Sequence, residues 1–196
     1  MSILSYTTED LDALRSAAHG YLNPKRVPHV LGCEQEAVAL ARRWGEREDL
    51  AAAAGILHDC TKRLSTEEHL ALADKYGIVL DALERGEHKL LHARTGAALA
   101  RDIFDVCEQV ASAIEWHTTG CQDMTLLQKI IYMADYIEPT RDFPGVEKLR
   151  ALAYKNLDDA MILGLQMSNE EVIAKGGTPH PRSLALLDQL MNKNSL

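Results

Sequence analysis

Six residues whose side chains can bind a metal ion recur along this sequence: His29, His58, Asp59, His92, His117 and Asp135. Each lies on or beside the apolar face of an expected helix. Burying a histidine or an aspartate on such a face costs free energy unless the side chain finds a partner. A pair of metal ions would satisfy all six, because imidazole and carboxylate groups are the usual ligands of divalent first-row metals. The spacing therefore predicts a metal site between helices.

The separations between these positions are 29, 34, 25 and 18 residues, so each ligand group would come from a different helix. His58 and Asp59 are adjacent, and neighbouring helical side chains point about 100° apart. Both can reach one ion only near a helix end or a bend, which the following Cys60 and Thr61 could mark. A His-Asp pair alone is a weak signal that chance can produce. The prediction depends on the convergence of all six residues.

Each residue taken alone has an ordinary structural interpretation. Asp135 could form a salt bridge to a buried arginine, and His117 could be a core histidine bonded to a carbonyl group. His29 and His92 each sit near an expected helix start, where a structural role is common. The remaining histidines are expected outside the ligand set, with His180 left unassigned and three on the surface: His19, His69 and His88.

The elements that must position these residues are helices, because apolar residues recur at helical spacing and no segment alternates with the period of a strand. We expect one all-α domain over residues 1–196, a helical bundle with the metal site in its centre. The expected helices are about 8–21, 28–44 closed by Gly45, 49–57 capped by Asp49, 65–76 stopped by Gly77, 93–104, 108–116, 125–137, 146–174 with a break near Asn156 or Gly164, and 182–190. Residues 81–89 are polar and ambiguous.

The composition limits the function classes. A net charge of −8 argues against general nucleic-acid binding, which relies on clustered lysine and arginine. The four cysteines show no C-x-x-C pairing and are expected to be reduced and mostly buried: Cys33, Cys60, Cys107 and Cys121. The longest apolar run is too short to cross a membrane, and no signal peptide is visible. We expect a cytoplasmic protein without membrane or nucleic-acid partners.

The pattern H…HD…D across helices resembles the HD superfamily of metal-dependent phosphohydrolases, with His29, His58, Asp59 and Asp135 at its four positions. Further segments resemble the YqeK branch of that superfamily, known as symmetrical bis(5′-nucleosyl)-tetraphosphatase. These segments extend from residue 25 to residue 182: KRVPHV at 25–30, HDxxK at 58–62, LH at 91–92, WHTTG at 116–120, ADYIEP at 134–139, RDFPGV at 141–146 and HPR at 180–182. The family often has an aromatic and a small residue after the His-Asp pair, where this chain has Cys60 and Thr61.

The resemblance implies two metal ions, with iron as the expected metal and manganese, cobalt or zinc also compatible with such ligands. By this analogy His29, His58, Asp59 and Asp135 hold one ion. His92 and His117 hold the second, and Asp59 bridges the two. The implied activity is symmetric hydrolysis of diadenosine tetraphosphate to two ADP, by attack of a metal-bridging hydroxide on a central phosphorus.

Candidate substrate contacts flank these positions. Lys62 lies four residues after His58, and its ammonium group could hold a phosphate as a point charge. Asp59 and Lys62 are the expected catalytic residues. Arg26 can offer a bidentate fork to phosphate. The remaining candidates lie beside His117 and Asp135: Thr118, Thr119, Arg141 and Asp142. The structural alternative for Arg26, Lys62 and Arg141 is a solvated charge or an ordinary ion pair.

Three other readings compete with this hypothesis. An HD phosphohydrolase of another nucleotide would use the same ligands, although the blocks at 118–120 and 141–146 favour the dinucleoside polyphosphate branch. A nucleotide sensor without turnover would not need six ligands, and a purely structural helical protein would leave six polar residues unexplained. No glycine-rich phosphate loop is present, which argues against a kinase or a P-loop NTPase. Apolar helix faces are compatible with a homodimer.

Overall fold

The computed structural model describes residues 5–193, and over this range every regular element is a helix. The all-α prediction is therefore confirmed. The elements are α1 (Thr8–His19), the 3-10 helix η1 (Pro24–Arg26), α2 (Val27–Trp44), α3 (Glu48–Leu57), α4 (Thr66–Lys75), α5 (Ala82–Gly86), α6 (His88–Phe104), α7 (Glu108–Trp116), α8 (Leu126–Ile137), α9 (Val146–Ala153), α10 (Leu157–Ala174) and α11 (Pro181–Lys193).

Several helices begin where the sequence predicts, because polar caps satisfy the first backbone N–H groups. Thr7, Ser65 and Thr125 each accept a hydrogen bond from the backbone three residues on, in capping boxes that start α1, α4 and α8. The expected break at Asn156 is confirmed, since this residue caps α10 after α9 has ended. The alternative break at Gly164 does not occur.

Two predicted helix starts were wrong. Asp49 does not cap α3, which begins one residue earlier; its carboxylate accepts a hydrogen bond from the backbone N–H of Tyr6 instead. Helix α6 begins at His88, because the side chain of Glu87 accepts from the backbone N–H of Lys89. Because α6 begins at His88, a full helical turn precedes His92.

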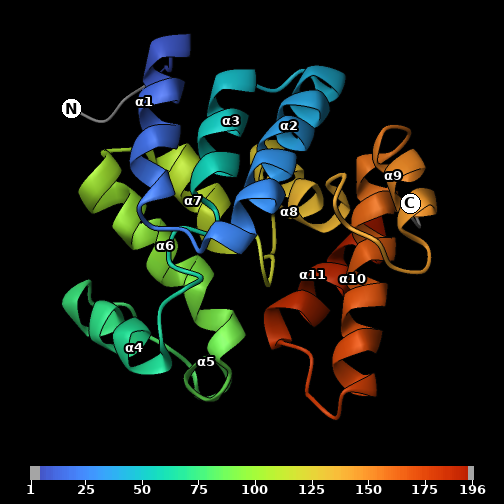
Figure 1. Cartoon of the computed structure of the whole chain (residues 1–196). Coiled ribbons are helices and arrows are strands. Elements are labelled where there is room, and N and C mark those ends of the chain that lie inside the picture. Colours follow the sequence, from blue (N-terminus) through green and yellow to red (C-terminus); the bar gives the residue numbers. More distant parts are fainter. Residues whose placement is uncertain (1–4, 194–196) are drawn as a thin grey trace.

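Helices α2, α3, α7 and α8 pack on one another at the centre of the fold (Figure 1). Helix α1 lies against α3. Helices α4 and α5 both lie against α6, and α9 to α11 extend the bundle on the side of α8. The core between the central helices is fully buried and mostly aliphatic, with Leu40, Leu57, Ile114 and Ile130 at its middle. Burial of this apolar surface is what fixes the central helices relative to one another.

Helices α2 and α3 approach closely at Gly55, which follows a run of four alanines in α3. A Cβ atom at Gly55 would lie 2.8 Å from the Cα atom of Glu34 on α2, which is too short for any larger residue. This close approach brings the end of α3 beside the start of α2. His29 and His58 are carried by these two helix ends.

Within the described residues no helix is long and apolar enough to span a lipid bilayer. The four cysteines are free thiols, and three of them are buried, as expected: Cys33, Cys60 and Cys107.

Candidate metal centre

The six predicted ligand residues meet at the centre of the bundle, each brought there by a different part of a helix. Their places are the first turn of α2 for His29, the two residues after α3 for His58 and Asp59, the second turn of α6 for His92, the C-cap of α7 for His117 and the last turn of α8 for Asp135. Helix α3 ends at Leu57, so the expected helix end at the His-Asp pair is present and lets both side chains turn inward.

The first group of side chains surrounds His29. Its Nε2 atom lies 3.1 Å from Nε2 of His58, 3.1 Å from Oδ1 of Asp135 and 3.6 Å from Oδ2 of Asp59. The Nε2 atom of His58 is in turn 3.5 Å from the same oxygen of Asp59. Four potential ligand atoms therefore converge on one small volume.

A second group lies on the other side of Asp59. The Nε2 atom of His92 is 3.0 Å from Nε2 of His117 and 3.4 Å from Oδ1 of Asp59. This oxygen of Asp59 is buried and accepts no hydrogen bond within the described chain. One carboxylate thus presents its two oxygens to two separate groups of imidazoles.

The orientation of the rings is set by hydrogen bonds at Nδ1. In His58, His92 and His117 this atom faces the backbone carbonyl oxygen three residues earlier, at 2.8, 2.7 and 2.6 Å. A carbonyl oxygen can only accept, so Nδ1 carries the proton and Nε2 keeps its lone pair. These Nε2 atoms lie close together, His29 with His58 and His92 with His117, so a metal ion placed between them could bind both lone pairs of each pair.

Burial lowers the pKa of His58 and His92, and it lowers the pKa of His117 to about 4. The three imidazoles are therefore neutral at pH 7, as metal ligands must be. Burial alone would raise the pKa of Asp59, but the neighbouring His58, His92 and Lys62 hold it well below its usual range. The donor set at neutral pH is neutral imidazole with ionised carboxylate, which fits divalent first-row metal ions.

Three cationic side chains surround the carboxylates of this cluster. Arg26 forms an ion pair with Asp59. Lys62 lies 4.0 Å from Oδ1 of Asp59, and Arg141 pairs with Asp135 at 2.5 Å. The structure thus places the three predicted cations at the edge of the cluster, and Arg26 and Arg141 form ion pairs there, which was the structural alternative to a phosphate contact.

The other predicted substrate contacts lie differently. The hydroxyl of Thr118 is 3.3 Å from Nε2 of His92, at the cluster. Thr119 is buried, but its hydroxyl donates to the carbonyl of Gly120, away from the cluster. Asp142 is exposed and forms no hydrogen bond or ion pair with the described residues. The structure therefore brings Thr118 to the site and leaves Asp142 outside it.

Glu138 belongs to the site although sequence reasoning did not select it. It is fully buried, and its Oε1 atom accepts a hydrogen bond from Nδ1 of His29 at 3.0 Å. Burial would raise its pKa, but hydrogen bonds from Thr140 and His29 lower it, so the carboxylate stays ionised. The available signal was its place three residues after Asp135, directly before Pro139, at the end of a helix that carries a predicted ligand.

The surface prediction for His69 was wrong. His69 was predicted on the surface and is completely buried, because α4 packs its inner face on α6 and the ring bonds the Thr95 hydroxyl at 2.8 Å. His180, left unassigned, is also buried, and its Nε2 atom lies 3.2 Å from the carboxylate of Asp81. His19 is exposed as predicted.

Comparison with known proteins agrees with this arrangement. The HD domain family matches residues 26–140. A protein of Halalkalibacterium halodurans named symmetrical bis(5′-nucleosyl)-tetraphosphatase is 38% identical, over 87% of this chain and 91% of that protein. A protein of the same name from Bacillus subtilis is 38% identical over 74% of this chain and 78% of its own length.

A crystal structure from Clostridium acetobutylicum, described as a predicted HD superfamily hydrolase involved in NAD metabolism, superposes with a TM-score of 0.89. It is 37% identical in sequence, and the match covers 93% of this chain and 97% of that one. The HD domain match, the curated relatives and the solved structure thus indicate the same family as the cluster of His and Asp side chains. The chain belongs to the HD domain family and, within it, groups with the symmetrical bis(5′-nucleosyl)-tetraphosphatases.

Proposed function

We propose that this protein hydrolyses diadenosine tetraphosphate symmetrically, giving two ADP. The observation that carries the proposal is the pair of histidine groups that share Asp59, one on each carboxylate oxygen. The names of the two curated relatives, both symmetrical bis(5′-nucleosyl)-tetraphosphatase, support a dinucleoside tetraphosphate as the substrate class, and a Mycoplasma genitalium relative is named a probable Ap4A hydrolase. A dinuclear centre also resolves the conflict between a net charge of −8 and a polyanionic substrate.

The cluster is proposed to hold two metal ions, and iron is the metal we expect. The first site would use His29, His58, Asp59 and Asp135, and the second would use Asp59 with His92 and His117. The facing Nε2 lone pairs and the unpartnered Oδ1 atom of Asp59 support this assignment. When bound, two such ions lower the pKa of a water molecule and polarise a phosphoryl oxygen.

The surrounding side chains would bind and orient the substrate. Symmetric hydrolysis adds water across the central anhydride: the water oxygen joins one inner phosphorus atom, and the other inner phosphate leaves with the former bridging oxygen as ADP. Lys62 and Arg26, both beside Asp59, are placed to hold phosphate oxygens of the two halves. Arg141 would take the same role beside Asp135.

The hydroxyls at the end of α7 complete the proposed substrate site. Thr118, at 3.3 Å from His92, is placed for a phosphate or ribose oxygen. Thr119 would contribute its backbone, because its hydroxyl is already bonded. Asp142 has the least support of the proposed contacts, since it is exposed beyond the cluster.

The buried free thiols suit a reducing compartment, so we place the protein in the cytoplasm. Homodimer formation stays a prediction, and light scattering on the purified protein tests it.

The experiment that tests the function is product analysis after incubating the metal-loaded protein with diadenosine tetraphosphate. We expect ADP as the sole nucleotide product. AMP together with ATP would mean that the attacked phosphorus is not a central one, and the symmetric assignment would be wrong. Absence of turnover by a protein that holds both metals would refute the activity and direct the search to other phosphorylated nucleotides.

A further inference from the structure

A cavity of about 610 Å³ lies beside the candidate metal centre, lined by residues of α5, the start of α6, the end of α10 and the loop before α11. Figure 1 shows the course of these helices. Its volume is in the range of small-ligand sites, and much of its lining is apolar. Apolar walls are supplied by Leu83, Leu90, Val172 and Pro179. Neither the proposed metal ligands nor the three cations at the cluster line this cavity.

The cavity adjoins the candidate metal centre at the end of α7. Thr118 and Thr119 line its inner wall, and the Thr118 hydroxyl is 3.3 Å from Nε2 of His92. A ligand that fills the cavity and extends past Thr118 therefore reaches the second histidine group. Lys89 and Glu87 also line the cavity, as does Lys175, which forms an ion pair with Glu171.

Asn169 supplies the cavity with a polar group that has no partner. This α10 residue lines the cavity, is only 8% exposed, and its Nδ2 atom forms no hydrogen bond within the described chain. A buried amide donor without a partner costs free energy in the free protein. The cost is removed if a ligand accepts a hydrogen bond there.

The wall of the cavity that α5 and the loop before α11 form is held in place by hydrogen bonds of His180 and by an ion pair of Arg182. His180 accepts a hydrogen bond from the backbone N–H of Arg182 at 3.1 Å, and its other ring nitrogen is 3.2 Å from Asp81. Arg182 also pairs with Glu84, which is 1% exposed, at 2.7 Å. These contacts tie α11 and the loop before it to α5. The cavity is therefore largely formed before any ligand arrives.

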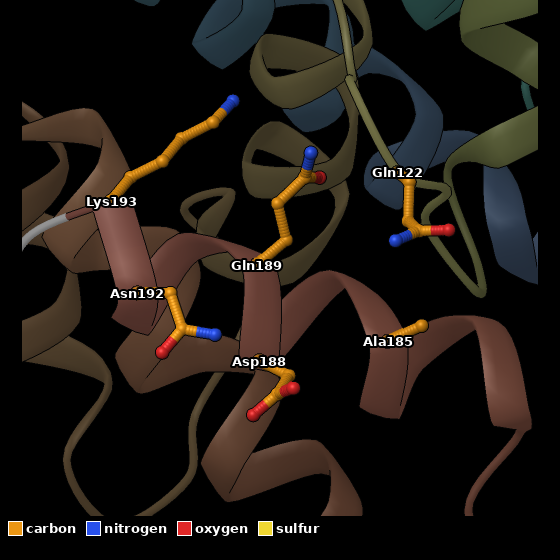
Figure 2. A pocket seen from close by; sticks show the side chains of 6 residues that line it. All are labelled: Gln122, Ala185, Asp188, Gln189, Asn192 and Lys193. Atoms are coloured by element: carbon orange, nitrogen blue, oxygen red, sulfur yellow. The ribbon is translucent and has the colours of Figure 1, made fainter.

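A second hollow, on α11, has none of these properties. It is lined by Gln122 and by side chains of α11 that Figure 2 shows spread along the outer face of the helix. Gln189 is already bonded to Asp123, and Asp188, Asn192 and Lys193 are exposed. Its residues provide matched controls.

We propose that the cavity between α5 and α10 binds the nucleoside at one end of the substrate and that Asn169 selects adenine there. This inference rests on the proposed hydrolysis of dinucleoside tetraphosphates. The Asn169 amide offers one donor and one acceptor, which match N7 and the 6-amino group of adenine. Guanine presents two acceptors along the same edge, so one amide atom would stay unpaired. The apolar walls cover the base, and the phosphates of the bound substrate extend past Thr118 to the metal centre.

The test compares diadenosine and diguanosine tetraphosphate in steady-state kinetics. Asn169→Leu should lower kcat/KM for the adenosine substrate about five- to hundredfold, mainly through KM, and change the guanosine substrate little. The preference for adenosine would then largely disappear. Asn192→Leu, in the hollow of Figure 2, should change neither substrate. If Asn169→Leu leaves the ratio of the two substrates unchanged, Asn169 does not select the base.

A second pair of variants tests the cavity without altering Asn169. Ala82 lines the cavity but is solvent-exposed, so Ala82→Trp can fill the space with little risk to folding. This variant should raise KM for both substrates and keep its metal content. Ala185→Trp fills the second hollow and should leave KM unchanged. An unchanged KM in Ala82→Trp would overturn the proposed nucleoside site. Failure of the unmodified protein to produce ADP would instead refute the proposed function.

Discussion

The Nε2 atoms of His29 and His58 lie 3.1 Å apart, although each ring is oriented by a hydrogen bond on its opposite nitrogen. The Nδ1 atom of His58 donates to a carbonyl oxygen, and that of His29 donates to the carboxylate of Glu138. In these tautomers two lone pairs face each other, with Asp135 also 3.1 Å from His29. We interpret this contact as a preorganised metal site, because a shared cation would bind both lone pairs and the Asp135 carboxylate beside them.

Asp59→Ala should abolish turnover and remove both metal ions. Its carboxylate is the one group that faces both histidine pairs, so each proposed site would lose a ligand. Helix content should stay nearly unchanged, because Asp59 lies after the end of α3. Elemental analysis, product assays and circular dichroism check these points. Asp188→Ala, an exposed carboxylate on α11 (Figure 2), is the control. A variant that keeps both metals would disprove the bridging role.

Lys62→Ala should retain the metals but lower kcat/KM by about ten- to hundredfold, the typical effect of losing a hydrogen bond to a charged group. Lys62 lies between Asp59 and His92, where its ammonium group can reach a bound phosphate. Lys75→Ala, which removes an exposed lysine of α4, is the matched control. Kinetics equal to those of the unmodified protein would mean that Lys62 only balances the charge of Asp59.

Much of this site could be predicted from the sequence because the metal ligands are polar residues on otherwise apolar helix faces. His117 and Asp135, for example, follow apolar residues at helical spacing, and such a conflict with burial is visible without a structure. The helix starts at Thr7, Ser65 and Thr125 were equally predictable, since a capping box is a local pattern.

The residues that sequence reasoning missed depend on tertiary packing. Glu138 follows a helix end and looks like an ordinary surface glutamate, and only the approach of α2 brings His29 to it. His69 has charged neighbours along the chain, but the packing of α4 on α6 buries it completely. Asn169 lies on a helix without a strong apolar face, so its burial could not be recognised from periodicity.

Glu138→Gln should weaken metal binding about 10- to 100-fold, the usual effect of losing the partner of a metal-bound histidine. The amide keeps the shape of the side chain but loses the negative charge that faces His29. We expect faster metal loss to a chelator, with kcat recovered when excess metal is added. Glu147→Gln, which alters an 83% exposed glutamate in the same region, should behave like the unmodified protein. If the metal affinity of Glu138→Gln is unchanged, the role of Glu138 is limited to the hydrogen bonds that hold the loop at Thr140.

His69 should make the protein less stable in mild acid. Burial lowers its pKa from 6.5 to about 4, so between these values the unfolded chain binds a proton at His69 that the folded chain does not. The free energy of unfolding should therefore fall as the pH drops from about 6.5 towards 4, with a loss from this group on the order of 2 kcal/mol at pH 5.

Replacing the ring removes this proton linkage. His69→Gln keeps a polar partner for Thr95, which now bonds the ring at 2.8 Å, and should be less stable at pH 7 but lose less stability on acidification. Denaturant unfolding of both proteins at pH 7 and pH 5 measures the difference. His19→Gln, at an exposed position of α1, should keep the pH dependence of the unmodified protein. Parallel stability curves for His69→Gln and the unmodified protein would show that folding does not change the pKa of His69, because only a difference in pKa between the two states produces this linkage.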